Sequence, residues 1–287
     1  MAQDLTGKVF LITGATEGIG KAAALEFCKR GAQVVLVGRS KEKSERVVTE
    51  LKSQSQSDKI DLLLGDLSSL AEIRAVAAAF LKKYDRLDVL VNNAGALFTE
   101  YTLSADGFEK TFALNHLSYF LLTHELLPLL KKTPGSRVVS TSSAAHQTGK
   151  MDLAFIAKRD GKSAGFGSYG DSKLANILFT RALARRAKEV AVNCFHPGFV
   201  QTGFGQNNTG MMAGFISFTA KLFARTPEKG AETLVWLAVS PDAAKLSGEY
   251  CYDCRPKKTT KLAQDEAVAE GLWSLSEKLC GITPTNS

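Results

Sequence analysis

Two spacings of hydrophobic residues alternate along the 287-residue chain. Short runs that are apolar at nearly every position have the length and composition of strands buried on both faces of a parallel sheet. These runs lie at 8–13, 33–37, 60–64, 87–91, 137–141 and 191–195. Between them, hydrophobic residues return every three or four positions, which predicts helices. The best-defined helical stretches lie at 21–30, 41–52, 70–84 and 174–188.

Strands that alternate with helices are joined by right-handed crossovers, which places the strands parallel in one sheet with helices on both faces. We therefore predict an α/β fold, a single doubly wound Rossmann domain with about seven parallel strands. No linker or repeat divides the sequence, so the predicted domain spans residues 1–287. Residues 147–168 lose periodicity and predict an inserted loop, while residues 203–225 begin irregularly and continue as an amphipathic helix.

Composition narrows the class of protein. Hydrophobic residues make up 45% and charged residues 23% of the chain, which is typical of a globular protein and excludes a disordered one. The formal net charge of +7 suits acidic ligands in general, but the sequence has no nucleic-acid recognition motif, so no nucleic-acid partner is expected. Five cysteines are too few for a disulfide framework in a chain this long.

No apolar stretch of the sequence has the length of a membrane-spanning helix. The most apolar windows, 120–130 and 211–223, are shorter than the roughly 20 residues that such a helix needs. The first residues also lack the apolar stretch of a signal peptide. We expect a soluble, cytoplasmic protein with no integral membrane segment, and the sequence leaves open whether it forms a homo-oligomer.

A glycine-rich loop with the sequence TGATEGIG follows the first predicted strand and opens a helix at residues 13–20. Glycines allow the sharp turn and the close approach of a pyrophosphate, and the helix N-terminus supplies free N–H groups with a partial positive charge. A tight turn without a ligand is the alternative, but the position between strand and helix favours a dinucleotide site. The predicted cofactor residues here are Gly14, Thr16, Gly18, Ile19 and Gly20.

The end of the second predicted strand indicates which dinucleotide binds. About 20 residues after the glycine-rich loop, NAD-binding folds usually carry an acid that holds the ribose 2′-hydroxyl. This chain has Gly38, which leaves room, and Arg39 there instead. A guanidinium suits a phosphate, so the sequence predicts NADP(H) in preference to NAD(H), although an exposed arginine without a ligand is the alternative.

Tyr169 and Lys173 lie four residues apart, which puts a phenol and an ammonium on one face of a helix. A free tyrosine has a pKa near 10, and a neighbouring ammonium is expected to lower that pKa toward the range useful for acid–base catalysis. Alone, the pair is equally consistent with a pair on a helix surface.

Taken together, the motifs resemble the short-chain dehydrogenase/reductase family from Lys8 to about Ile282. They occur in family order: TGxxxGIG at 13–20, GDL at 65–67, NNAG at 92–95, Asn115, STSS at 140–143, YxxxK at 169–173 and HPGxVxT at 196–202. The long segment between Ser143 and Tyr169, the KLAN stretch at 173–176 and the C-terminal SGEYxxD at 247–253 resemble the retinol-dehydrogenase-like branch. The N-terminal membrane helix of many retinoid enzymes is absent from this sequence, which argues against a retinoid substrate.

The resemblance implies a role for each catalytic position. Tyr169 would exchange the proton with the substrate oxygen, and Lys173 would hold the nicotinamide ribose and lower the tyrosine pKa. Ser143 would hydrogen-bond the substrate carbonyl, with Ser142 as its rival, and Asn115 would seat a water of the proton relay. Further cofactor contacts implied by position are Asp66, Leu67, Asn92, Ala94, Gly95, Pro197, Gly198, Val200 and Thr202.

The predicted function is NADP(H)-dependent interconversion of a carbonyl and an alcohol on an apolar small molecule by hydride transfer. Reduction of a conjugated C=C bond, as in protochlorophyllide-reductase-like relatives, is one alternative, and a catalytically silent NADP(H) sensor is another. In this family the region of 203–225 covers the substrate. Its apolar stretch therefore allows three interpretations: a lid, a helix packed on the body or on a second subunit, or a membrane-surface contact.

Cys251 and Cys254 have a spacing that is found in zinc and redox sites. Zinc needs four ligands, however, and neither a second cysteine pair nor a histidine pair stands nearby. The same segment is expected to form the last strand, so we interpret both residues as structural. The histidines at 116, 124, 146 and 196 lack metal-ligand spacing, and His196 is expected to position the turn that follows it. No metal site is predicted.

Overall fold

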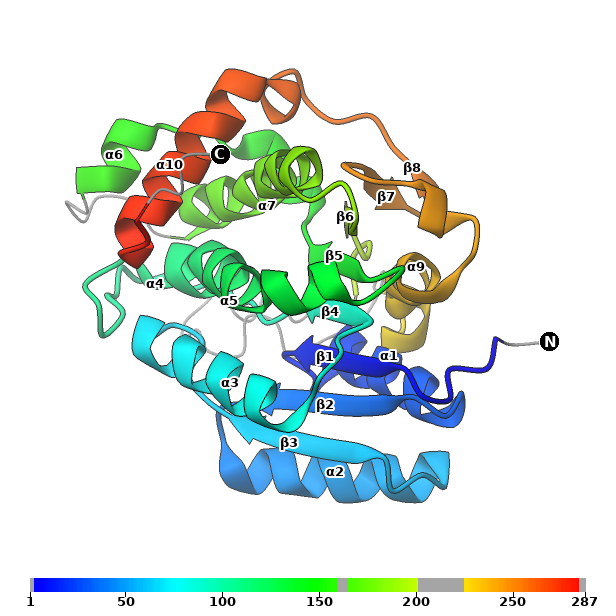
Figure 1. The fold of residues 1–287 in the computed structure, drawn as a ribbon. Helices are drawn as coiled ribbons and strands as arrows, with labels where there is room; N and C mark the ends of the chain where they lie inside the picture. Colours follow the sequence, from blue (N-terminus) through cyan, green and yellow to red (C-terminus); the bar gives the residue numbers. More distant parts are fainter. Residues whose placement is uncertain (1–2, 159–164, 201–224, 284–287) are drawn as a thin grey trace.

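The computed structural model describes residues 3–158, 165–200 and 225–283, and eight strands in these ranges form one sheet. Their order across the sheet is β3-β2-β1-β4-β5-β6-β7-β8 (Figure 1). Seven are mutually parallel: β1 (Val9–Thr13), β2 (Gln33–Gly38), β3 (Ile60–Leu64), β4 (Val89–Asn92), β5 (Arg137–Thr141), β6 (Ala191–Phe195) and β7 (Tyr250–Tyr252). The short β8 (Arg255–Pro256) is antiparallel to β7. The predicted doubly wound fold is confirmed.

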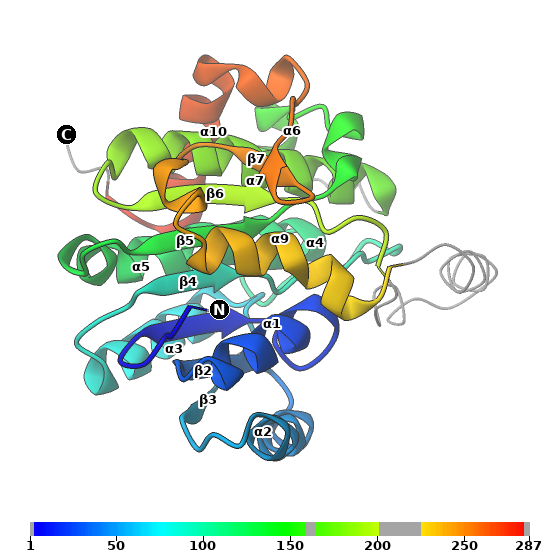
Figure 2. The ribbon, with the colours of Figure 1, turned by 90° about the vertical axis from the view of Figure 1, so that its right-hand side faces the viewer.

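Helices cover both faces of this sheet (Figures 1 and 2). One face packs against α1 (Gly18–Lys29), α2 (Lys41–Ser55) and α9 (Pro227–Val239). The other packs against α3 (Leu70–Lys83), α5 (Ser118–Lys132) and α7 (Phe166–Arg186), with α10 (Glu266–Cys280) outside α7. Shorter pieces are α4 (Lys110–Phe112), the π-helical η1 (Ala113–Leu117), η2 (Ala144–Thr148), α6 (Leu153–Lys158), η3 (Ala243–Lys245) and η4 (Leu262–Gln264). Among the helices described here, none is both long and apolar enough to cross a membrane.

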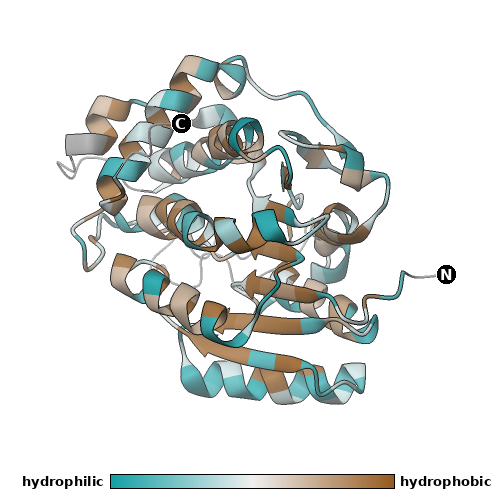
Figure 3. Cartoon of the chain, viewed as in Figure 1, coloured by the Kyte–Doolittle hydropathy of each residue, from teal (hydrophilic) through white to brown (hydrophobic). Residues whose placement is uncertain are grey.

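Alternation along each strand divides the core into two layers. In β1, Phe10 and Ile12 pack toward α1 and α9, whereas Val9 and Leu11 pack toward α3 and α5. All four are buried, so the strand is apolar on both sides and its sequence is a continuous hydrophobic run. Figure 3 shows the result, with hydrophobic strands at the centre and hydrophilic residues along α2.

The inserted region differs from the prediction of a loop. Residues 147–168 contain the whole of α6, which packs against α10, and α7 begins at Phe166 rather than at 174. The first turns of α7 escaped the periodicity because Ser168, Gly170 and Ser172 are small or polar yet buried. The predicted helix within 203–225 lies outside the described residues except for Arg225, and so does the predicted cofactor residue Thr202.

The topology creates a crevice where the strand order reverses. β1 pairs with β2 on one side and with β4 on the other. The connections after β1 and β4 therefore leave the sheet in opposite directions, and their separation opens a space beyond the C-terminal ends of the strands. Ligands of open α/β sheets bind at such a point.

Candidate active site

A pocket opens at this crevice. Its lining comprises Gly14, Thr16, Glu17, Val37, Gly38, Arg39, Ser40, Lys43, Ser44, Gly65, Asp66, Leu67, Ser68, Ala94, Gly95, Ala96, Phe98, Lys110 and Leu114. The predicted cofactor residues among these are Gly14, Thr16, Arg39, Asp66, Leu67, Ala94 and Gly95. Residues from four separate loops therefore meet around one space, as a long and extended ligand requires.

The glycine-rich loop has the shape of a phosphate cradle. Gly14 has a φ of +64°, and a Cβ there would lie 2.7 Å from the Ala94 Cα atom. A Cβ at Gly20 would lie 2.4 Å from the Gly14 carbonyl oxygen, so larger residues would push α1 off the loop. Helix α1 begins at Gly18, and among the described side chains its N-cap residue Glu17 makes no capping hydrogen bond. The first N–H groups of α1 are therefore left to a ligand.

Two cations stand at the end of β2. The Arg39 side chain is 64% exposed, and its Nη1 lies 3.8 Å from the Asp66 Oδ2 atom. Lys43, in the first turn of α2, forms an ion pair with Glu17. Burial acts to raise the pKa of Asp66, but hydrogen bonds from Ser68 and the Arg39 charge outweigh it and hold that pKa below its usual value. This end of the pocket is open and ionic.

Sequence reasoning missed part of this lining. The predicted cofactor residues leave out Glu17, Val37, Gly38, Ser40, Lys43, Ser44, Gly65, Ser68, Ala96, Phe98, Lys110 and Leu114. A signal was available for Lys43, because it is a cation in the first turn of the helix that follows Arg39. The room that Gly38 leaves is taken up by a neighbouring serine, since a Cβ at Gly38 would lie 2.1 Å from the Ser44 Oγ atom.

The two asparagines after β4 have different surroundings. The Asn92 side chain is fully buried and donates to Thr123 Oγ1 at 2.9 Å, so it ties β4 to α5 and does not line the pocket. Asn93 instead donates through Nδ2 to the carbonyl oxygens of Thr13 and Gly14, at 3.1 and 3.0 Å. The two side chains differ because successive residues of a strand point to opposite faces. The cofactor contact predicted for Asn92 stays a prediction. Asn93 is the residue that holds the glycine-rich loop.

Tyr169 and Lys173 lie on α7 as predicted. The Lys173 ammonium is 5.5 Å from the centroid of the Tyr169 ring and donates to the Thr141 carbonyl oxygen at 3.2 Å. Only 3% of Lys173 is exposed, and burial lowers the pKa of its ammonium to about 7. The helix therefore holds a lysine that exchanges a proton near neutral pH.

The tyrosine pKa departs from the prediction. Burial raises the pKa of Tyr169 to about 12, although hydrogen bonding to Ser143 acts in the opposite direction. The predicted lowering by Lys173 is wrong for the residues as they are placed here. The physical reason is desolvation: burial disfavours the charged phenolate, and the hydrogen bond with Ser143 offsets only part of that cost.

The geometry separates the two candidate serines. Ser142 is 1% exposed, and its Oγ donates to the Lys173 carbonyl oxygen at 2.8 Å. Ser143 is half-buried, its Oγ accepts from the Ala145 N–H at 3.2 Å, and it hydrogen-bonds the Tyr169 side chain. Ser142 therefore ties the end of β5 to the backbone of α7. Ser143 is the serine beside the tyrosine.

Asn115 lies in η1, a π-helical turn of the kind that often marks functional sites. Its Oδ1 accepts from the Ala96 N–H at 2.9 Å, and its Nδ2 donates to Ala96 O and to Ser172 Oγ, both at 3.0 Å. A Cβ at Gly95 would lie 3.1 Å from the Asn115 Oδ1 atom and 3.4 Å from the Lys173 Nζ atom. The loop after β4, η1 and α7 therefore converge here.

The turn after β6 packs beside the start of α1. Pro197 and Gly198 begin this turn, and Gly198 has a φ of +84°. Val200 reaches toward the glycine-rich loop, because a Cβ at Gly230 would lie 2.6 Å from the Val200 Cγ2 atom and 2.8 Å from the Ile19 Cγ2 atom. None of these residues lines the pocket described above. Ile19 and Val200 instead pack α1 and α9 against the turn.

The two cysteines with zinc-like spacing lie at the edge of the sheet. Cys251 is buried in β7 and Cys254 is half-buried in the following turn. Throughout the described ranges, no group of three or more His, Cys, Asp or Glu side chains is arranged to hold a metal ion. The Nδ1 atom of His196 accepts from the Gly198 N–H at 3.2 Å, so this histidine does position the turn.

The parallel sheet, the glycine cradle at its switch point and the Ser–Tyr–Lys–Asn group beside it define a dinucleotide-binding oxidoreductase site. A family model described as short chain dehydrogenase matches residues 8–213. The chain belongs to the short-chain dehydrogenase/reductase family, a family of oxidoreductases, as its motifs predict.

Individual relatives agree with the predicted branch. The chain is 40% identical to retinol dehydrogenase 14 of Mus musculus over 290 residues, which covers 96% of this chain and 86% of that protein. A structure of an uncharacterized protein from Mycobacterium paratuberculosis shares 28% identity at a TM-score of 0.78, covering 99% of this chain and 97% of that chain. A short chain dehydrogenase from Escherichia coli CFT073, solved with NADPH, shares 26% identity at a TM-score of 0.68, covering 89% and 100%.

Proposed function

We propose that the protein is an NADP(H)-dependent oxidoreductase that interconverts a carbonyl and an alcohol on an apolar small molecule, with Tyr169 as general acid and base. The observation that carries this proposal is the convergence of Ser143, Tyr169 and Lys173 beside the crevice at the strand ends. Family membership supports the reaction class. We further propose that residues 1–287 act as one domain, in the cytoplasm.

The chain's own residues divide the work. A bound nicotinamide would supply the hydride in reduction and accept it in oxidation. Tyr169, with its pKa raised to about 12, keeps its proton at neutral pH and would donate it to the substrate oxygen in reduction. Ser143 would donate a hydrogen bond to that same oxygen and hold it toward Tyr169.

Two further residues complete the proposed proton path and cofactor contact. Lys173 would bind the nicotinamide ribose hydroxyls through its ammonium, whose distance to the Tyr169 ring centroid of 5.5 Å leaves it on the same side of α7. Asn115 would seat a water that links this lysine to solvent. Its present contacts to Ala96 and Ser172 hold its amide near Gly95 at the edge of the pocket.

The preference for NADP(H) rests on the charges around the end of β2. Arg39 is exposed and Lys43 lies in the first turn of α2, so two cations can face a ribose 2′-phosphate. Asp66 already draws Arg39 toward the pocket at 3.8 Å. A related enzyme solved with NADPH supports the same cofactor.

The proposed substrate is apolar. Phe166 is 54% exposed at the start of α7, the helix that carries Tyr169 and Lys173, and Phe199 is 50% exposed in the turn after β6. The name of the mouse relative, retinol dehydrogenase 14, is in keeping with an apolar alcohol. We propose no nucleic-acid partner, and an assembly of identical subunits is left to measurement.

The test is consumption of NADPH against a panel of aldehydes, ketones, quinones and enones, with Tyr169→Phe alongside. We expect carbonyl turnover in the wild type and a loss of about 1,000-fold in kcat in Tyr169→Phe, with NADPH affinity unchanged, because only proton transfer is removed. Tyr84→Phe is the matched control, since it deletes a hydroxyl that contacts Asp61 far from this site.

Each other outcome has a distinct meaning. Turnover of enones alone would replace the proposal with C=C reduction. Tight NADPH binding without turnover of any class would support a sensor. Retention of most activity in Tyr169→Phe would remove the tyrosine from the mechanism.

A further inference from the structure

The C-terminal SGEYxxD motif has no part in the proposed function, yet the structure gives its aspartate a defined place. Asp253 lies in the tight turn between β7 and β8. Asp253 and Cys254 have φ values of 49° and 56°, in the left-handed region that non-glycine residues seldom adopt. The turn is held from α9, because the Cys254 N–H donates to Thr233 Oγ1 at 3.2 Å.

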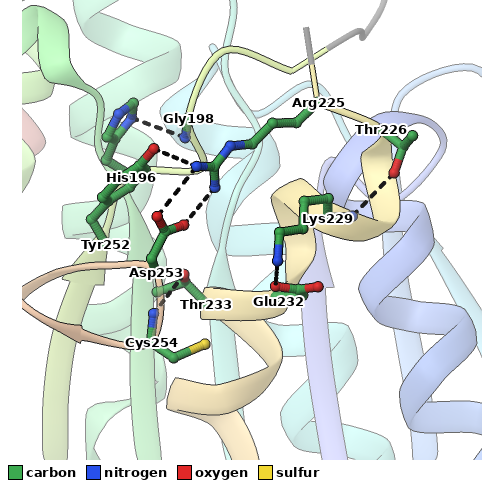
Figure 4. Close-up of polar contacts among 10 residues, drawn as sticks. All are labelled: His196, Gly198, Arg225, Thr226, Lys229, Glu232, Thr233, Tyr252, Asp253 and Cys254. Atoms are coloured by element: carbon green, nitrogen blue, oxygen red, sulfur yellow. Dashed lines mark hydrogen bonds and ion pairs between the residues drawn. The ribbon is translucent and has the colours of Figure 1, made fainter.

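Arg225 lies just before α9, and its side chain reaches this turn (Figure 4). Its Nη1 and Nη2 atoms lie 2.5 and 3.2 Å from the two Asp253 carboxylate oxygens, which makes a two-point pair. The Nη2 atom also contacts the Tyr252 hydroxyl at 2.5 Å, and the guanidinium carbon is 4.9 Å from the centroid of the Tyr252 ring. The arginine is therefore held in position by an anion, a hydroxyl and an aromatic face.

The same arginine lies on the turn after β6. Its backbone N–H donates to the Phe199 carbonyl oxygen at 2.7 Å, and residue 225 pairs with Val200 in a parallel bridge. A Cβ at Gly198 would lie 2.9 Å from both Cδ and Nε of Arg225. Glycine at 198 is therefore needed both for its positive φ and for the passage of the arginine side chain.

His196 completes a ring of contacts. It accepts from the Gly198 N–H at 3.2 Å, and its ring stacks on Tyr252 with centroids 4.8 Å apart and planes at 16°. Burial, together with the charges of Lys257 and Arg225, lowers the pKa of His196 to about 4, so its Nδ1 stays available as an acceptor at neutral pH. The contacts therefore form a closed ring: Arg225 contacts Tyr252, Tyr252 stacks on His196, and His196 bonds Gly198. Gly198 in turn lies against the Arg225 side chain.

This ring is coupled to the phosphate loop by packing. Val200, whose backbone pairs with residue 225, meets Ile19 across Gly230 at the start of α9. Ile19 lies in the glycine-rich loop and is the second residue of α1. The turn after β6 is therefore anchored on the first turn of α1 as well as on Arg225.

We propose that Arg225 is a positioning residue for the cofactor: held by Asp253 and Tyr252, it fixes the Gly198–Val200 turn that borders the nicotinamide half of the site. The inference rests on the proposed function, because it assigns this turn to a nicotinamide cofactor. Within the described part of the chain, Arg225 itself touches neither the predicted catalytic group nor the pocket lining. Its effect therefore falls on one half of the ligand.

The molecule contains a matched control for the chemistry of Arg225. Arg186 on α7 also makes a two-point pair, with Glu270 of α10, and its guanidinium carbon lies 4.3 Å from the centroid of the Trp273 ring. Side-chain exposure is similar, at 27% for Arg225 and 33% for Arg186. Arg186→Met removes the same kinds of contact at the far end of α7 from Tyr169.

The test measures the dissociation constants of NADPH and of 2′,5′-ADP for the wild type, Arg225→Met and Arg186→Met. 2′,5′-ADP carries the adenosine half and the 2′-phosphate but no nicotinamide. We expect Arg225→Met to weaken NADPH about 10-fold and 2′,5′-ADP less than about 2-fold, because the hydrogen bonds that it removes hold a turn on the nicotinamide side only. Arg186→Met should leave both dissociation constants within about 2-fold. It should lower the melting temperature by about as much as Arg225→Met does.

Asp253→Asn and the double variant with Arg225→Met test the pathway of the effect. If the aspartate acts through the arginine, Asp253→Asn weakens NADPH by a few-fold and the double variant is no weaker than Arg225→Met alone. Unchanged NADPH binding in Arg225→Met overturns the inference, as does equal weakening of both ligands or an equal loss in Arg186→Met. A wild type that binds neither ligand would instead overturn the proposed function.

Discussion

The two ends of the candidate site are built on opposite physical principles. At the end of β2, the Arg39 side chain is 64% exposed and pairs loosely with Asp66 at 3.8 Å. At the end of β5, Lys173 is 3% exposed, and its charge is reduced by burial. Exposed charges select a charged ligand without losing their own ionisation, whereas buried groups change their acid–base behaviour. Recognition and proton transfer are therefore assigned to different environments on one sheet.

The buried end holds its groups by shared backbone contacts. The Thr141 carbonyl oxygen accepts from Lys173 Nζ at 3.2 Å and from Asn176 Nδ2 at 3.1 Å. Ser142 in turn donates to the Lys173 carbonyl oxygen at 2.8 Å. The strand end and the helix thus fix each other, and the catalytic side chains gain an orientation that no exposed pair would keep.

After Tyr169→Phe, the serine pair offers the largest expected effect within the buried end. Ser143→Ala should lower kcat about 100-fold with NADPH affinity unchanged, because a hydrogen bond to the substrate oxygen is removed in the transition state. Ser142→Ala should instead cost about 1 kcal/mol of folding stability and leave kcat within a few-fold, because it removes a buried structural bond. Steady-state kinetics and urea unfolding of both variants check this. A larger loss of kcat in Ser142→Ala would reverse the assignment.

The exposed end is tested by Arg39→Asp. The variant should weaken NADPH by about 30-fold, since a guanidinium–phosphate contact becomes a repulsion, and should change NADH binding by less than about 3-fold. Titration of both cofactors against the wild type measures the difference. Lys41→Asp is the matched control, because Lys41 is also an exposed cation at the start of α2 but is absent from the pocket lining. Equal losses for both cofactors would contradict a 2′-phosphate contact.

A further expected effect concerns the dependence of folding stability on pH. Lys173 has a pKa of about 7 when folded and its ordinary value of 10.5 when unfolded, so between these values the unfolded chain binds more protons. The free energy of unfolding should therefore rise with pH in this window, by at most about 1.4 kcal/mol per pH unit from this group. Urea unfolding at pH 7, 8 and 9 should show that rise reduced in Lys173→Met. Parallel pH profiles would mean that Lys173 keeps its charge.

Much of the fold was accessible from local pattern. The strands β3, β5 and β6 have the predicted bounds, because each is a short run rich in apolar or β-branched residues between polar or turn-forming residues. The first turns of α7 were not predicted, because their small and polar residues are buried by neighbours rather than by an apolar stripe. The helix α6 was missed because its 6 residues are too few to show a helical period, and its packing partner α10 lies far along the chain.

The candidate site divides in the same way. The motifs located Tyr169, Lys173 and the glycine-rich loop, because spacing along a helix or turn dictates which groups share a face. Motifs did not distinguish the roles of Asn92 and Asn93, which depend on the direction of each side chain at a strand end. They also gave the wrong direction for the Tyr169 pKa, since burial is a property of the assembled fold.

The sequence by itself determined the class of fold, the family and the residues at which chemistry is expected, because these follow from periodicity and from short-range spacing. Tertiary structure alone decided which serine faces the tyrosine, how far burial shifts the pKa values of Tyr169 and Lys173, and that Arg225 meets Asp253. The physical reason is distance along the chain. Desolvation and contacts between remote segments arise only when the sheet brings separate strand ends to one edge.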